Sequence, residues 1–180
     1  TFNASATVFQ LQSDSELVFV GDAGTTEPKG ASRRNGLELV ASYLDRKGFQ
    51  LDGFFAVVDA RFIGVQDQGI PNAIRQSGAL SLSQAIGDFK LGYKLRYLGS
   101  APLVEDRSLR SDSVINSDAF LNYRVNKDLN VTLSVFNLFD RENSDIQYAQ
   151  DYAIAGTPGF GRTFHPAVPR QARLTVNLQF

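Results

Sequence analysis

The sequence offers few residues with catalytic chemistry, and the first of them is its only histidine, His165. A Ser–His–Asp triad needs such an imidazole as the general base for a serine hydroxyl. The chain has no Gly-x-Ser-x-Gly elbow to present that serine, and His165 directly precedes Pro166. With one His and no Cys, neither a multi-histidine metal site nor a thiolate zinc site is available. We expect His165 to be an ordinary loop or packing residue, and we expect no catalysis and no cofactor.

Two more segments contain the residue types of binding sites but lack the required spacing. The glycine-rich run 156–161 resembles a phosphate cradle in composition, but no helix start and no Lys follow it. We therefore expect a flexible loop there. Asp140, Glu142 and Asp145 cluster after an apolar run, yet they lack the spacing of a calcium loop. Solvated loop charge is the expected outcome, and no metal site is predicted.

Aromatic and cationic side chains gather in the last long connection, at Tyr148, Tyr152, Phe160 and Arg162. Aromatic and Arg side chains are enriched in recognition surfaces. Tyr148, Tyr152 and Arg162 are therefore candidate contacts for a small-molecule ligand. The alternative is a self-packed loop that covers the mouth of a barrel.

Arg33 and Arg34 form a second cationic site. Guanidinium groups bind phosphates and carboxylates well, so this pair is a candidate for an anionic ligand or for lipopolysaccharide phosphates. Solvated charge at the top of a strand is the alternative. The net charge of the whole chain is -1, which excludes the basic footprint of a nucleic-acid-binding protein.

Composition places the chain among ordered, single-domain proteins. It has 180 residues, of which 43% are hydrophobic and 21% charged, so it is not a disordered sequence. No apolar run approaches the roughly 18 residues of a membrane helix. The sequence contains no Met, so we expect that something precedes Thr1 in the translated protein, either a signal segment or a larger part of a longer chain.

Period-2 alternation runs through the sequence and predicts an all-β fold. The clearest example places Phe89, Leu91, Tyr93, Leu95 and Tyr97 on one face of a strand. About eight strands are expected, with the first broken or bent around residues 13–15. They lie near 4–20, 34–45, 49–62, 76–85, 88–99, 114–126, 129–138 and 169–180.

The connections between these strands alternate in length. Tight turns are expected at 45–48, 86–88 and 126–128, whereas long connections lie near 21–33, 63–75, 100–113 and 139–168. Outer-membrane barrels have this asymmetry, with short periplasmic turns and long extracellular loops. Periodicity alone leaves a soluble antiparallel β-domain as the alternative, because it does not tell whether the apolar face meets lipid or a core.

The side chains on the two strand faces favour the membrane barrel. The polar face carries charges that suit a watery lumen better than a dry core, namely Lys90, Lys94, Arg96, Arg124, Arg173, Glu38, Asp59 and Arg61. Aromatic residues suited to interfacial girdles are Tyr43, Phe49, Tyr93, Tyr97, Tyr123, Phe136 and Phe180.

Several motifs resemble the C-terminal part of a TonB-dependent outer-membrane receptor. Segment 135–141, Val-Phe-Asn-Leu-Phe-Asp-Arg, resembles the family's penultimate-strand motif, and 169–180 resembles its closing strand with the C-terminal Phe. The run 161–166 resembles the loop that enters that strand. Segments 16–22 and 32–39 look like a matching hairpin of the same family. Residues 70–73 and 95–99 fit the same pattern.

The resemblance implies an antiparallel transmembrane β-barrel in the bacterial outer membrane. Residues 1–180 would form a single C-terminal segment, about the last third of a barrel of about 22 strands, without the plug domain. The implied partners are outer-membrane lipid, the rest of the barrel and the plug, TonB through the plug region, and a ligand such as a metal chelate. Iron-siderophores and vitamins are the substrates it suggests, and no nucleic acid is expected.

The loop lengths place the C-terminus on the periplasmic side. The resemblance further implies that the last strand carries the signal for the barrel-assembly machinery, in Leu174, Val176, Leu178 and Phe180. The alternative is that these residues are simply the lipid-facing side of that strand. For the whole chain, the first rival is a self-contained eight-stranded barrel that acts as an anchor or adhesin. The second rival is an enzyme dependent on His165.

Overall fold

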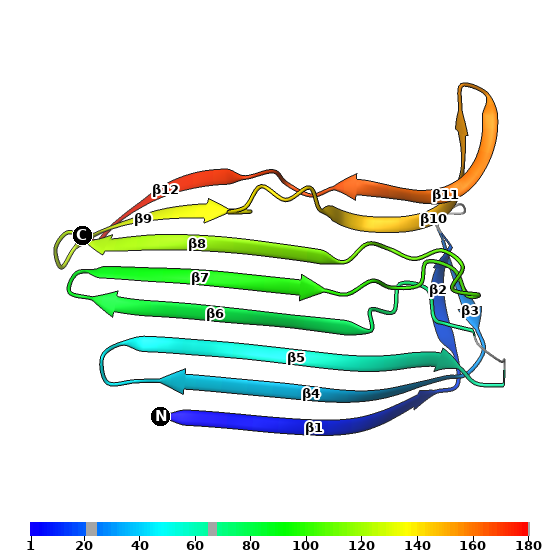
Figure 1. The fold of residues 1–180 in the computed structure, drawn as a ribbon, viewed down its shortest axis with the longest axis horizontal. Coiled ribbons are helices and arrows are strands. Elements are labelled where there is room, and N and C mark those ends of the chain that lie inside the picture. The colour runs from blue at the N-terminus through cyan, green and yellow to red at the C-terminus, as the bar shows by residue number, and fades with distance from the viewer. Residues whose placement is uncertain (21–24, 65–67, 180) are drawn as a thin grey trace.

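The chain is built of antiparallel strands (Figure 1). The computed structural model describes residues 1–20, 25–64 and 68–179. No helix within these residues is long and apolar enough to cross a membrane. The strands, in chain order, are β1 (Phe2–Ser13), β2 (Glu16–Val20), β3 (Thr25–Lys29), β4 (Ser32–Leu44), β5 (Phe49–Phe62), β6 (Gln76–Ile86), β7 (Phe89–Leu98), β8 (Val114–Arg124), β9 (Leu129–Phe136), β10 (Ser144–Ile154), β11 (Thr157–Pro166) and β12 (Gln171–Leu178).

Eight of these strands form one antiparallel sheet in the order β1-β4-β5-β6-β7-β8-β9-β12. They are 8 to 14 residues long, which is longer than the usual strand of about 5–6 residues in globular proteins. β1 and β12 are the two edges, so among the described residues the sheet is open rather than closed into a barrel. The predicted all-β, antiparallel architecture of about eight strands is confirmed, and the structure shows an unclosed section of a barrel wall.

Two of the predicted elements differ from the structure, and both differences lie at the long connections. The hairpin expected from 16–22 and 32–39 is wrong, because Glu16–Val20 pairs with Thr25–Lys29 whereas β4 pairs with β1 and β5. The chain turns sharply after β1, where the Ser13 hydroxyl donates to the Ser15 carbonyl at 2.8 Å. Residues 21 and 22 of the expected hairpin lie outside the described residues.

The connection at 139–168 contains a second hairpin, β10–β11, that the sequence analysis did not predict. Its turn consists of Ala155 and Gly156, which have φ angles of 51° and 80°. Two consecutive residues with positive φ are typical of a type I′ turn between antiparallel strands. The expectation of a flexible glycine-rich loop at 156–161 is therefore wrong, since most of this run lies in β11.

The three predicted tight turns are present and lie together at one end of the sheet, the left end in Figure 1. Side-chain oxygens organise two of them. Asp45 Oδ1 accepts from the backbone N–H groups of Lys47 and Phe49 at 2.8 and 2.7 Å. Asn126 Oδ1 accepts in the same way from Asp128 and Leu129, both at 2.9 Å. Such Asx turns explain why Asp and Asn stand at these positions.

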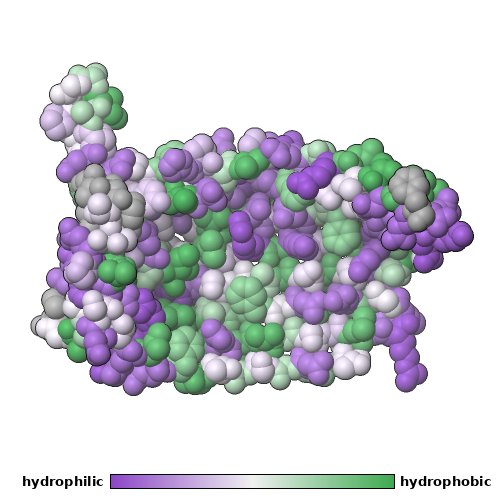
Figure 2. All heavy atoms as spheres, turned by 180° about the vertical axis from the view of Figure 1, so that it is seen from behind, coloured by the Kyte–Doolittle hydropathy of each residue, from purple (hydrophilic) through white to green (hydrophobic). Residues whose placement is uncertain are grey.

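The strand register separates one apolar face from one polar face over the whole sheet. Leu39, Phe55 and Gly78 occupy one cross-strand row of the apolar face, which continues to Tyr97 on β7. The opposite face carries Lys90, Lys94 and Arg96 of β7 and Arg173 of β12, in agreement with the alternation in the sequence. Figure 2 shows hydrophilic residues dominating both ends of the sheet, with hydrophobic and hydrophilic side chains mixed between them.

Three side chains lie on the face opposite to the one expected. Asp59 and Arg61 share a face with Phe55 and Val57, so they continue the apolar face beyond its outer end instead of lining the lumen. Phe136 lies on the polar face, with the Arg173 guanidinium 4.8 Å from its ring centre. The strands alternate without a break here, so Asp59 and Arg61 lie where the apolar face has already ended, and Phe136 follows Ser134 on the polar face.

Aromatic residues of the apolar face line the short-turn end of the sheet. The rings of Phe89 and Tyr123 stack at 4.6 Å, and those of Tyr43 and Phe49 meet at 6.2 Å. Aromatic side chains at one level along the strands are typical of a membrane interface. This arrangement matches the expected girdle at the end of the sheet that carries the short turns.

No second layer formed by residues 1–20, 25–64 or 68–179 covers the apolar face of the sheet. Its large side chains are exposed, for example Leu174 at 67% and Val176 at 60%. Among the described residues, the buried hydrophobic side chains all lie at the long-loop end, namely Val18, Phe62, Ile70, Ala101 and Leu103. A soluble sandwich would bury its apolar sheet face, whereas a barrel wall presents that face to lipid.

Candidate ligand-binding face of the outer loops

The long connections form a packed layer rather than separate loops. Val18 of β2, Phe62 at the end of β5 and Ile70 of the 63–75 connection make one hydrophobic cluster. The 63–75 and 100–113 connections are joined by backbone bonds, from Gly69 N–H to the Glu105 carbonyl and from Asn72 N–H to the Pro102 carbonyl, both 2.8 Å. This layer supplies a rigid base for groups that lie above the sheet.

A half-buried ion pair fixes the β2–β3 hairpin to the barrel wall. The Glu16 carboxylate accepts from Arg34 Nη2 at 2.9 Å and from the Ser32 hydroxyl at 2.6 Å. The Arg34 hydrogen bond, aided by Ser32 and outweighing the opposing effect of burial, lowers the pKa of Glu16 to about 2. Arg34 is therefore engaged within the chain. It is not free to bind an anionic ligand or a lipopolysaccharide phosphate, which was one of the two expectations for it.

The segment 135–141 has a structural explanation centred on Asn137. This residue is 5% exposed, has φ of 49° and donates its backbone N–H to the Asp118 carboxylate at 3.0 Å. Its side-chain amide donates to the carbonyls of Arg141 and Val168 and accepts from Arg141 N–H. Asn tolerates the left-handed conformation, so one residue ends β9 and ties its exit to the entry of β12.

Asp140, the first residue of the acidic cluster after β9, stabilises the same connection between β9 and β12. Asp140 Oδ1 accepts from the backbone N–H of Arg170 at 3.0 Å, and the two side chains lie 3.6 Å apart. Asp140 thus stabilises the return of the chain toward β12. No group of three or more His, Asp or Glu side chains within residues 1–20, 25–64 and 68–179 could hold a metal ion.

Three side chains attach the β10–β11 hairpin to the neighbouring loop. Gln147 is 8% exposed, and its amide accepts from the Asp112 N–H at 2.9 Å and donates to the Asp112 carbonyl at 3.4 Å. Asn143 donates to the Ile115 carbonyl at 2.9 Å. Arg162 Nη1 lies 2.7 Å from Asp112 Oδ1. Sequence reasoning missed Gln147 and Asp112, because no local pattern marks a contact across 35 residues.

All three candidate ligand contacts lie on this hairpin, but they do not share a face. Tyr148 and Tyr152 stand on one face of β10, opposite Thr163 and Gly159 of β11. Arg162 pairs with Ala149 and therefore points to the other face. The ring of Tyr152 lies over Gly159, where an added Cβ would meet it at 2.8 Å. His165 is an exposed residue of β11, opposite Ile146.

Two neighbouring hollows lie between the hairpin and the sheet. The outer hollow has a volume of about 380 Å³ and is lined by Tyr148, Gln147 and Asn72 among others. The inner one, about 450 Å³, includes Arg96, Arg173 and Asp118 on the polar face. Both are lined by Leu98, Val114, Ser144 and Asp145, so the two hollows are neighbours, one toward the outer loops and the other on the polar face of the sheet.

The residues expected to carry the assembly signal lie on the apolar face of the edge strand β12. Leu174, Val176 and Leu178 stand opposite Leu133, Val131 and Leu129 of β9, and all three are exposed. Phe180 lies outside the described residues. A uniform apolar face fits both expectations for this strand, recognition during assembly and contact with lipid.

Comparisons with known proteins agree with this architecture. The family described as "TonB dependent receptor-like, beta-barrel" matches residues 1–138. The catecholate siderophore receptor Fiu of Escherichia coli K12 is 28% identical over 98% of this chain, and the probable TonB-dependent receptor BfrD of Bordetella pertussis is 28% identical over 87%. The crystal structure of the closed form of the ferric-catecholate import receptor Fiu superposes with a TM-score of 0.75 at 25% identity, over 99% of this chain and 25% of that one.

An open antiparallel wall of long strands, with one uncovered apolar face and packed loops at one end, defines a section of a transmembrane β-barrel. The chain belongs to the TonB-dependent receptor β-barrel family. It spans about a quarter of the length of the curated relatives that it matches, 23% for Fiu and 22% for BfrD. Members of this family are outer-membrane proteins of Gram-negative bacteria, and the relatives are receptors rather than enzymes.

Proposed function

We propose that this chain forms part of the wall and outer loops of an outer-membrane receptor that takes up a ferric catecholate siderophore with energy from TonB. The similarity to the catecholate receptor Fiu over 98% of the chain carries this proposal. The two neighbouring hollows, one lined by Tyr148 near the outer loops and the other by Arg96 on the polar face, support it. No observation favours a vitamin as the substrate.

In this proposal the long loops face the outside of the cell and the short turns face the periplasm. Residues 1–180 are one barrel segment, and a plug domain outside this segment occupies the lumen. Lys90, Lys94 and Arg96 are exposed on the polar face and have no ion-pair partner within the described part of the chain. Unpaired charges require water or a polar partner, which a hydrated lumen with a plug supplies. An open sheet edge is not stable in lipid, so further strands must pair with β1 and β12.

Tyr148 and Tyr152 are proposed to contact the ligand on one face of the hairpin, and Arg162 to add positive charge from the other face. A ferric catecholate is aromatic and anionic, which suits aromatic faces and a guanidinium. The two tyrosines share a face of β10, and Tyr148 lines the outer hollow. Leu174, Val176, Leu178 and Phe180 are proposed to serve the barrel-assembly machinery as the terminal strand.

The test is equilibrium binding to the receptor purified from its full reading frame. We expect a ferric catecholate to bind at least about tenfold more tightly than a ferric hydroxamate. We expect Tyr148→Ala and Tyr152→Ala each to weaken ferric catecholate binding, whereas the control Tyr43→Ala, at the short-turn end, leaves it unchanged. Equal affinity for the two iron chelates would contradict the proposed substrate class.

A self-contained eight-stranded barrel is less well supported. Its first and last strands would have to pair with each other, whereas β1 pairs only with β4 and β12 only with β9 among the described residues. The open sheet, together with the quarter-length match to the relatives, favours a section of a larger barrel.

A further inference from the structure

The apolar face of the sheet ends abruptly at its outer end, along β4 and β5. The cross-strand row of Leu37 and Val57 is apolar, and the next row outward consists of Asn35 and Asp59. Beyond it Arg33 and Arg61 stand directly opposite each other. A barrel face changes from apolar to polar where hydrocarbon meets lipid headgroups. These rows therefore mark the outer membrane interface on this side of the wall.

The opposition of Arg33 and Arg61 is unfavourable without an anion. Like charges directly across two antiparallel strands destabilise the pair. Arg61 Nε donates to Asp59 Oδ2 at 2.7 Å, which compensates only one of the two charges. The cross-strand neighbour of Arg33 on β1 is Gln12, which carries no charge. Both arginines are exposed, so each guanidinium has N–H groups left to donate.

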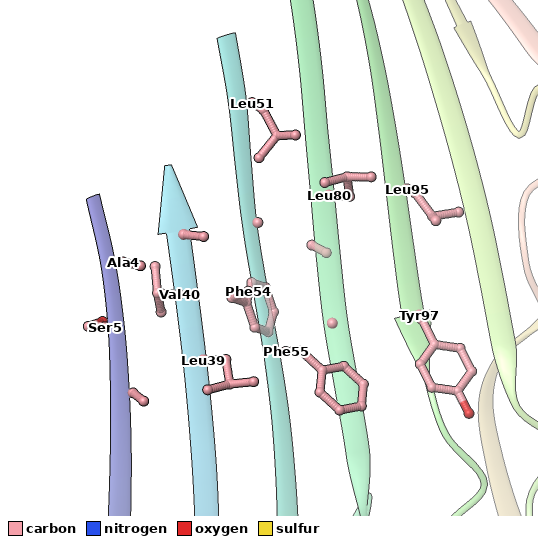
Figure 3. A pocket seen from close by; sticks show the side chains of 15 residues that line it. Ala4, Ser5, Leu39, Val40, Leu51, Phe54, Phe55, Leu80, Leu95 and Tyr97 are labelled. Atoms are coloured by element: carbon pink, nitrogen blue, oxygen red, sulfur yellow. The ribbon is translucent and has the colours of Figure 1, made fainter. Parts of the chain in front are cut away.

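A hollow of about 710 Å³ lies on the same face, closer to the short-turn end (Figure 3). Its floor consists of small residues of neighbouring strands, and larger side chains such as Leu39, Phe55 and Leu80 stand around it. The Leu39–Phe55 row at its edge is three cross-strand rows inward from Arg33 and Arg61. At about 3.4 Å per residue these rows span about 20 Å along the tilted strands. Half of the hydrocarbon core is about 15 Å thick, so an acyl chain of the outer leaflet reaches this hollow.

We propose that Arg33 and Arg61 bind the phosphate of an outer-leaflet lipid whose acyl chain lies over Leu37 and Val57 and enters the hollow. Guanidinium groups bind phosphate through two parallel N–H bonds, and two of them from neighbouring strands clamp one phosphate. The phosphate lies between the two positive charges and compensates their repulsion. The site faces lipid and not the lumen, so it is separate from the two hollows proposed to serve the siderophore. It rests on the proposed function only for the outward orientation of the long loops.

Arg33 and Arg34 are adjacent in the sequence, but their side chains lie on opposite faces of the sheet. Arg34 points to the polar face and is held by Glu16, whereas Arg33 shares the lipid-facing side with Arg61, 28 positions later. Only the register of β4 and β5 brings the two lipid-facing arginines together. The proposed anion site therefore consists of Arg33 and Arg61, which the pairing of β4 and β5 brings together, and does not include Arg34.

The experiment measures lipid retention by the full-length receptor in detergent, by native mass spectrometry. The probes are phosphatidic acid, phosphatidylcholine and inorganic phosphate. We expect the receptor to retain phosphatidic acid, and Arg33→Ala with Arg61→Ala to reduce that retention at least about tenfold. The control, Arg46→Ala with Lys47→Ala, removes two cations at the short-turn end and should leave retention unchanged. Ala41→Leu fills the hollow and should weaken retention of the lipid.

Three outcomes would overturn the proposal. One is equal retention by the native receptor and the Arg33/Arg61 variant. Another is saturation of the site by inorganic phosphate with no gain from an acyl chain, which would make it a free-anion site. The third is equal retention of phosphatidylcholine, which would indicate non-specific lipid contact. Ferric catecholate binding is measured on the same samples, so failure of the lipid site and failure of the siderophore function are distinguished.

Discussion

Arg162 Nη1 lies 2.7 Å from Asp112 Oδ1, and this ion pair joins the β10–β11 hairpin to the loop before β8. Arg162 also donates to the Arg110 carbonyl at 3.4 Å. The side chain proposed to add positive charge from the other face of the hairpin is therefore already positioned by the protein. Asp112 is 63% exposed at its side chain, so the pair contributes little to stability, on the order of 0.2–1 kcal/mol.

The Arg162–Asp112 pair predicts opposite results for its two members. Arg162→Ala removes positive charge from the face of the hairpin behind Tyr148 and Tyr152 and should weaken ferric catecholate binding about tenfold, with a small change in unfolding midpoint. Asp112→Asn frees the guanidinium for an anionic ligand, so affinity should stay equal or rise. Equilibrium binding of the two variants decides between them. Equal losses in both variants would show that Arg162 only anchors the hairpin.

Asn137 should be among the most sensitive positions of the chain. Asn137→Ala removes three side-chain hydrogen bonds and places Ala at a φ of 49°, so we expect a loss of about 2–4 kcal/mol in the free energy of unfolding. Urea unfolding of the receptor measures this change. Asn177→Ala is the matched control, because this Asn is an exposed residue of the edge strand β12. Equal effects of the two substitutions would contradict the role assigned to Asn137.

We predict that position 92 must be Gly, because the ring of Phe120 occupies the space that a larger side chain would need. A Cβ at Gly92 would lie 2.0 Å from Phe120 Cε1, so Gly92→Ala forces the ring to move and should destabilise the wall by about 1–3 kcal/mol. At Gly53 the nearest atoms are 3.4 Å from the added Cβ, an ordinary contact, which makes Gly53→Ala the control. Combining Gly92→Ala with Phe120→Leu should recover part of the loss. The yield of folded receptor and its unfolding midpoint measure both effects.

The Glu16–Arg34 pair predicts that attachment of the β2–β3 hairpin depends on pH. The folded pKa of Glu16 is about 2, below the ordinary Glu value of about 4.3, so its contribution is complete above the ordinary value and is lost as pH falls toward 2. Hydrogen exchange of 25–29 should therefore lose protection between about pH 4 and 2. Glu16→Gln should show weak protection that does not change in this range. A wild-type profile as flat as that of Glu16→Gln would contradict the account.

The barrel wall could be predicted from the sequence because a strand that separates lipid from water must alternate. Seven of the eight wall strands were expected with boundaries close to those observed, from residues such as Leu91 and Lys94 that face opposite sides. The range 4–20, expected with a break or bend around residues 13–15, contains both β1 and β2, and the bend after Ser13 separates the two strands. Asp59 and Arg61 were assigned to the wrong face because alternation does not show where an apolar face ends.

The packed layer formed by the long connections could not be predicted, because contacts between residues far apart in the sequence hold it together. Gln147 accepts a hydrogen bond from Asp112, and Arg33 stands opposite Arg61 on the neighbouring strand. Neither relationship follows from a local sequence pattern. Tyr148, Tyr152 and Arg162 could be selected by residue type. Their division between the two faces of the hairpin depends on a β-bulge at the start of β10 and on the register it sets.

The central claim is that the eight-stranded sheet is a membrane wall with one face toward lipid and the other toward the lumen. Spin-label accessibility along β7 tests it most directly, and this chain contributes no Cys to the background. Single Cys substitutions from Lys90 to Tyr97 should alternate, with contact to dissolved oxygen highest at Leu91, Tyr93 and Leu95. A water-soluble nickel complex should be excluded from those three sites. Access of the nickel complex to both faces, or no alternation, would contradict the account.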